Sequence, residues 1–116
     1  MRPRFQADAD FNLKIVRGVR RRESVIDFQG AEIGGMIGLP DDEVLMRAAG
    51  FERILVSHDR RTMRTAFGRF LQRRHSPGLI LVSQKLDIGR AIEDLILIWA
   101  VSEAEEWRDR VAYLPL

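Results

Sequence analysis

Two kinds of hydrophobic pattern alternate along the chain. Short runs of consecutive or alternating apolar residues predict strands, and apolar residues that recur every three or four positions predict amphipathic helices. The strand patterns lie at 4–9, 24–28, 53–57, 79–83 and 110–114. The helical patterns lie at 13–22, 42–49, 60–74 and 88–101, and a short helix is expected to carry Trp107.

This order of elements predicts the fold class. Strands that alternate with helices of this length imply a parallel sheet covered by helices on both faces. The runs Ile54 to Ser57 and Leu79 to Val82 are almost wholly apolar, as expected for strands buried on both sides. We therefore expect an α/β protein, a three-layer α/β/α sandwich with a mostly parallel four- to five-stranded sheet, formed by residues 1–116 as one domain.

The predicted helices begin at residues that suit an N-cap. Asp10 or Asn12, Asp41, Asp59 and Asp87 each stand where a helical pattern starts, and Ser102 to Glu105 fits a capping box. A glycine-rich segment, 30–40, is expected to form an adaptable loop before the second helix. Each capping aspartate would contribute about 1 kcal/mol to stability.

Composition excludes several classes of chemistry. The 116 residues include no cysteine, which rules out disulfides, thiolate metal sites and cysteine nucleophiles, and fits a reducing cytoplasm. The first residues show no apolar core of a secretory signal. The most apolar stretch, 91–101, contains two acids and is too short to cross a bilayer. We expect a soluble cytoplasmic protein without a membrane partner.

Arginine clusters raise the question of nucleic-acid binding. The net charge is only +2, but the sequence pI is about 9.7. Clustered guanidinium groups attract phosphate and release counterions when nucleic acid binds. The clusters are Arg20 to Arg22, then Arg60, Arg61 and Arg64, then Arg69, Arg73 and Arg74. The last set equally fits a solvated outer helix face.

Three aspartates form a candidate metal site. Asp8 and Asp59 each follow a predicted strand, and in an open parallel sheet ligands bind beyond the carboxyl ends of the strands. The loop before Asp41 could bring that residue to the same edge. Three close carboxylates need a compensating cation, and an all-oxygen set suits Mg²⁺ or Mn²⁺. The alternative is that Asp41 and Asp59 are helix caps and Asp8 and Asp10 are merely exposed.

Other motifs carry less chemistry. Ser57, His58 and Asp59 cannot form a catalytic relay, because neighbouring residues of a strand point to opposite faces. His58 is expected to be structural or to touch a phosphate. The glycines of 30–38 match no nucleotide-binding motif. Residues 42–61 resemble a helix-turn-helix only up to Phe51, since Ile54 to Val56 suits a strand.

Several ordered sequence blocks resemble a family of short PIN-like proteins of uncharacterised function. The blocks are Asp8 to Phe11, Gly38 to Leu45 and Leu55 to Met63, and one branch of the family is similar at 76–78, 82–84, 102–107 and 113–116. The resemblance implies a PIN-type sandwich and, through the wider superfamily, Mg²⁺- or Mn²⁺-dependent ribonuclease chemistry like that of VapC-type toxins.

On this resemblance Asp8, Asp41 and Asp59 are the catalytic, metal-binding acids, with Asp42 or Glu43 as substitutes for Asp41. Many relatives carry Glu where this chain has Ala9, and Asp87 is the candidate for the late fourth acid.

The sequence therefore leads to a first hypothesis and two rivals. The first is a metal-dependent endoribonuclease, the toxin half of a toxin–antitoxin pair, in which Arg60, Arg61 and the Arg20 to Arg22 cluster hold the RNA backbone. The rivals are a non-catalytic module that binds nucleic acid or a protein, and a purely structural protein. Partners implied are RNA, an antitoxin protein and a second copy of the chain, because Trp99, Trp107 and the last long helix suit either a dimer face or the core.

Overall fold

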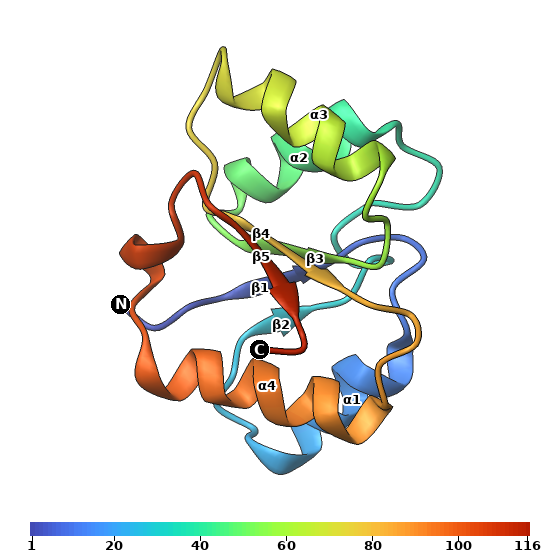
Figure 1. Cartoon of the computed structure of the whole chain (residues 1–116), viewed down its shortest axis with the longest axis vertical. Coiled ribbons are helices and arrows are strands. Elements are labelled where there is room, and N and C mark those ends of the chain that lie inside the picture. The colour runs from blue at the N-terminus through green and yellow to red at the C-terminus, as the bar shows by residue number, and fades with distance from the viewer.

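The computed structural model describes residues 1–116 and contains one sheet of five parallel strands between two helical layers. The strands, in spatial order, are β2 (Phe28–Gln29), β1 (Phe5–Ala7), β3 (Ile54–Ser57), β4 (Leu79–Val82) and β5 (Val111–Leu114). The helices are α1 (Leu13–Arg22), α2 (Asp41–Gly50), α3 (Thr62–Leu71) and α4 (Ile88–Val101). Helices α1 and α4 cover one face, and α2 and α3 cover the other (Figure 1). The predicted three-layer α/β/α sandwich is confirmed, and the sheet is wholly parallel.

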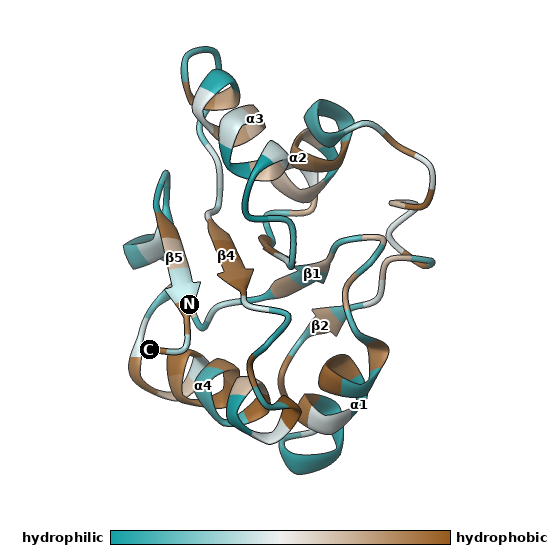
Figure 2. Cartoon of the chain, turned by 45° about the vertical axis from the view of Figure 1, so that its right-hand side comes forward, coloured by the Kyte–Doolittle hydropathy of each residue, from teal (hydrophilic) through white to brown (hydrophobic).

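Alternation along the central strands supplies both halves of the core. In β3, Ile54 and Val56 pack with α1 and α4, whereas Leu55 packs with α2 and α3. In β4, Ile80 and Val82 face the first layer, while its other two residues face the second. Figure 2 shows β4 as hydrophobic along its length. A strand covered on both faces needs apolar residues at every position, which explains the uninterrupted runs in the sequence.

The strand order creates a switch point between β1 and β3. The chain leaves β1 toward one edge to form β2, and then returns past β1 to form β3 on its other side. In an open parallel sheet the crevice for ligands lies at such a point, outside the carboxyl ends of the two strands. Asp8 follows β1, and His58 and Asp59 follow β3.

Two predicted elements differ from the structure. The second strand is only Phe28–Gln29, because residues 24–26 form a turn in which the Ile26 amide donates to Glu23, and Val25 is 70% exposed. The third helix is shorter than predicted and begins at Thr62, after residues that the Asp59 side chain holds in a turn. Helices α1 and α4 have the predicted bounds.

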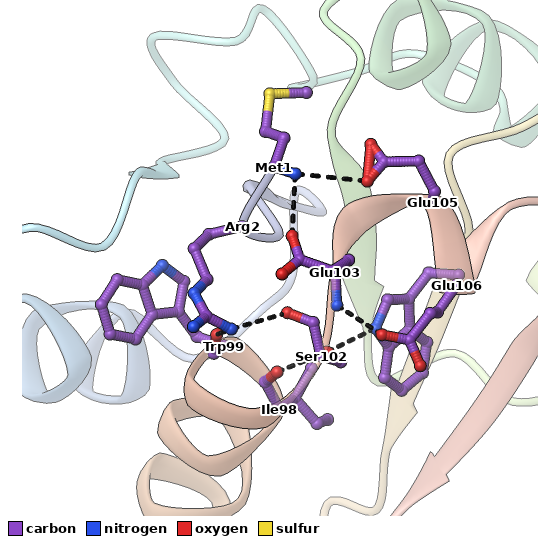
Figure 3. Close-up of polar contacts among 9 residues, drawn as sticks. Met1, Arg2, Ile98, Trp99, Ser102, Glu103, Glu105 and Glu106 are labelled. Atoms are coloured by element: carbon purple, nitrogen blue, oxygen red, sulfur yellow. Dashed lines mark hydrogen bonds and ion pairs between the residues drawn. The ribbon is translucent and has the colours of Figure 1, made fainter.

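The segment after α4 corrects the expected capping box. The box forms one residue later, between Glu103 and Glu106, and it starts a 3₁₀ helix, Ala104–Trp107. Ser102 instead accepts a hydrogen bond from the Trp107 indole at 2.9 Å. The amino group of Met1 contacts Glu103 at 2.8 Å beside this corner (Figure 3). Trp107 thereby packs against the core, and the hydrogen bond from its indole explains the shift. None of the helices combines the length and apolar character needed to span a membrane.

Candidate functional site

Asp8 is held at the switch point by the register of the sheet. Ala7 pairs with Val56, and the Asp8 amide donates to the Val56 carbonyl at 3.0 Å, so Asp8 stands next to Ser57. The Ser57 hydroxyl donates to Asp8 Oδ2 at 2.7 Å, and the Ala9 amide donates to Oδ1 at 2.8 Å. Two strands that are adjacent in the sheet therefore orient this carboxylate.

The environment of Asp8 disfavours its charge. Burial raises the pKa of the Asp8 carboxyl above its ordinary value, and the negative charges of Asp41 and Asp10 raise it further. The hydrogen bonds from Ser57 and Ala9 lower the pKa, but they do not cancel the rise. No cationic side chain pairs with Asp8, which is the situation in which a bound cation would be stabilised.

Asp59 lies beside Asp8 in the fold but points its carboxylate elsewhere. Its backbone amide donates to Ser57 Oγ at 3.0 Å, so one buried hydroxyl joins the two aspartates. Its Oδ1 accepts the Arg61 and Thr62 amides at 3.1 and 3.0 Å, and Oδ2 accepts the Thr62 hydroxyl. Partial burial raises the pKa of Asp59, but these hydrogen bonds outweigh it and the pKa lies below its ordinary value. Arg61 occupies the N-cap position of α3, so Asp59 is not the N-cap itself, but its carboxylate holds the turn that leads into the helix.

Asp41 does not cap α2, contrary to one of the two interpretations of the sequence. Pro40 occupies the N-cap position, and Asp41 is the first residue of the helix. Its half-buried carboxylate has no hydrogen bond or ion pair within the chain, and its charge acts on Asp8. The helix dipole favours an anion at this position, which explains why an acid is tolerated there. Asp41 is therefore available to a ligand in a way that Asp59 is not.

A second group of polar residues lies on the α1 and α4 side of the same edge. Asp10 borders a hollow that is also lined by Asn12, His58, Ser83 and Gln84. His58 Nε2 accepts the Asn12 amide at 3.2 Å, so Nδ1 carries the proton that it shares with the Val82 carbonyl at 2.9 Å. The ring also stacks on Phe11 with 4.6 Å between centroids. With both nitrogens engaged, His58 is structural, the first of the two expected roles.

The candidate substrate arginines border Asp59. Arg60 and Arg61 are exposed, and neither guanidinium pairs with a carboxylate. The Arg60 guanidinium lies 5.2 Å from the centre of the Tyr113 ring, which holds its face and leaves its N–H edge free. Arg20, by contrast, donates to the Phe28 carbonyl of β2. Because α1 runs back toward the amino end of the sheet, Arg20 to Arg22 lie away from the aspartates, and their expected contact with the same RNA backbone has no support.

The donor set at the switch point fits a hard cation in part. No group of three or more His, Asp or Glu side chains converges in the geometry of a metal site. Mg²⁺, however, is usually bound by one or two carboxylates together with water and substrate phosphates. Asp8 and Asp41, whose negative charges interact, are the two carboxylates that would fit that pattern. Asp87, the candidate fourth acid, is engaged as the N-cap of α4, where it accepts the Arg90 amide at 3.3 Å.

Two residues of the site were not recognised in the sequence. Ser57 takes no part in a catalytic relay, but it follows Leu55 on the α2 and α3 face of β3 and must adjoin Asp8 in a parallel register. Asp10 was considered only as a cap or an exposed acid, yet its charge raises the pKa of Asp8. The strand alternation identifies Ser57, and the spacing of two residues from Asp8 already places the charge of Asp10 nearby.

Comparison with protein-family models, with curated proteins and with solved structures finds no match to this chain. The fold class and the geometry at the switch point are thus the basis on which a function is proposed.

Proposed function

We propose that the protein is a metal-dependent ribonuclease in which Asp8 and Asp41 bind Mg²⁺ or Mn²⁺. The observation that carries this proposal is the half-buried Asp8, whose pKa is raised by burial and by neighbouring carboxylates at the end of β1. A carboxylate kept in an unfavourable environment at a switch point is typical of a functional group. The resemblance to PIN-like proteins points to the same chemistry.

Each neighbouring residue has a defined role in this proposal. Ser57 orients Asp8 through its 2.7 Å hydrogen bond. Asp59 fixes the start of α3, and through it the position of Arg60 and Arg61, whose free guanidinium edges contact the RNA phosphates. When bound, the divalent ion supplies charge that orients a water and neutralises the scissile phosphate. Asp59 accepts three hydrogen bonds where Asp8 accepts two, and its carboxylate is directed at the start of α3, so it would contribute to the metal site only indirectly.

Cleavage of labelled RNA by matched aspartate variants tests this function. We expect Asp8→Asn and Asp41→Asn to lower Mg²⁺-dependent cleavage by at least about 100-fold, since each removes a charged ligand. Asp27→Asn serves as the control, because Asp27 pairs with Arg53 near the opposite end of β3. Retention of full activity by both site variants, with EDTA still abolishing cleavage, would contradict the proposed ligands.

A second candidate is a module that binds nucleic acid without cleaving it. The three hydrogen bonds that the Asp59 carboxylate accepts favour this candidate, because they leave fewer free acids than a multi-metal nuclease uses. It predicts salt-sensitive RNA binding that EDTA does not change. A thermal-shift titration with Mn²⁺ separates the two: a rise of about 2.7 kcal/mol in stability is expected at 100 times the dissociation constant if the ion binds the native state, and no rise otherwise.

A further inference from the structure

A groove between α2 and α3 lies outside the aspartate site, and three of its seven lining residues are arginines. Its walls come from Asp42 and Met46 on α2 and from Arg69 and Phe70 near the end of α3, with Arg73 and Arg74 just beyond that helix. The sequence alone was consistent with a solvated coat for these arginines. In the structure the three arginines are exposed, as expected, and all three line one hollow.

The charge of the groove is not balanced within the chain. Arg69 contacts Asp42 at 3.3 Å, but both side chains are more than half exposed, so this pair contributes little. Arg73 and Arg74 have no carboxylate partner. Met46 is 49% exposed and Phe70 forms part of the wall, so the groove also offers apolar surface between the charges. An anion with an exposed apolar face would be complementary to it.

We infer that this groove binds the backbone of single-stranded RNA, with a base resting on Met46 and phosphates on Arg73 and Arg74. The inference rests on the proposed function and extends it, because it adds a second RNA contact on the α2 and α3 layer, where Asp42 of the groove follows Asp41 in α2. Single-stranded RNA is favoured over duplex, since only unpaired bases present a free π-face beside their phosphates.

The test is RNA binding measured by fluorescence anisotropy with labelled oligouridine in EDTA, over a series of salt concentrations. The variant is Arg73→Gln/Arg74→Gln. The control is Arg21→Gln/Arg22→Gln, which removes the same charge from the exposed end of α1 in the opposite layer. Each lost phosphate contact lowers the salt slope by about 0.7 for a single strand, so the groove variant should lose about 1.4 in slope and about tenfold in affinity at 0.1 M salt.

Each outcome decides the inference independently of the nuclease proposal. A selective loss in the groove variant, with unchanged unfolding by urea, supports the groove even if Asp8→Asn still cleaves RNA. Equal losses in the two double variants would reduce the effect to net charge and overturn it. Wild-type affinity in the groove variant would also overturn the inference, and so would tighter binding of a polyglutamate peptide than of oligouridine. Either result would do so even if Asp8→Asn abolishes cleavage.

Discussion

The two ends of the sheet differ in whether a buried or half-buried charged side chain has a partner of opposite charge. Toward the amino end, Arg53 lies at the start of β3 with its side chain only 13% exposed, and it contacts Asp27 at 2.6 Å. The same guanidinium reaches the Phe5 carbonyl of β1, so a single cation joins three segments of the chain. At the carboxyl end, Asp8 has hydrogen bonds but no cation, and burial, together with other acids, raises its pKa.

This difference separates stability from function. A sequence selected only for stability would pair or remove a half-buried carboxylate, as the chain does with Asp27 and Arg53. Rules of this kind are broken mainly at functional sites, where the cost is tolerated for binding. Not every carboxylate at the carboxyl end lacks partners. Three hydrogen-bond donors surround the carboxylate of Asp59. The same isosteric change, Asp to Asn, can therefore test each position.

The largest effect is expected at the amino end. Asp27→Asn leaves the Arg53 guanidinium largely buried without its counter-charge, and we expect a loss of about 1–2 kcal/mol, moderated because Asp27 itself is half exposed. Urea unfolding at neutral pH measures it. RNA cleavage should stay at the wild-type level. If Asp27→Asn destabilised the protein no more than a substitution at an exposed residue, the proposed difference between the two ends of the sheet would be wrong.

A smaller loss is expected for Asp59→Asn. The amide oxygen still accepts backbone donors at the start of α3, but the negative charge near the helix N-terminus is lost, which costs about 0.5–1 kcal/mol. Because the folded pKa is lowered, this contribution is present above the ordinary carboxyl value of 3.8 and is lost as pH falls through the folded pKa. Unfolding curves of wild type and variant should therefore converge in acid. A deficit that persists there would contradict a charge-based role.

Much of the fold could be predicted because its signals are local. Only a strand fits the apolar runs of β3 and β4, and only a helix fits the periodic patterns of α1 and α4. The structure has these four elements. The two-residue strand β2 could not be placed, since an edge strand this short is defined by its partner β1 and not by its own pattern. The sequence allows a capping box that starts at Ser102 or at Glu103. The box starts at Glu103 because the Ser102 hydroxyl accepts a tertiary hydrogen bond from Trp107.

The candidate site was predictable in position but not in detail. Parallel strands bring Asp8 and Asp59 to one edge, and this follows from the order of elements alone. Whether an aspartate caps a helix or faces a ligand depends on side-chain direction. The residue type allows both, so Asp59 proved to be engaged and Asp41 free for reasons that the sequence does not contain.

The only gain in stability, no larger than the loss at Asp59, is expected for Asp8→Asn. Without metal, neutralising this carboxylate removes its burial cost and its repulsion by Asp41 and Asp10, and relief of such a functional-site conflict commonly raises stability by about 0.5–1 kcal/mol. The sign with pH is opposite to that of Asp59. A raised folded pKa favours the native state below the ordinary value of 3.8, and this contribution is lost as pH rises through the folded pKa. The gain of the variant should therefore be absent in acid and appear toward neutral pH, and Mn²⁺ should reverse it by stabilising only the wild type. A variant that is less stable than wild type at neutral pH without metal would mean that Asp8, like Asp27, is there to hold the fold.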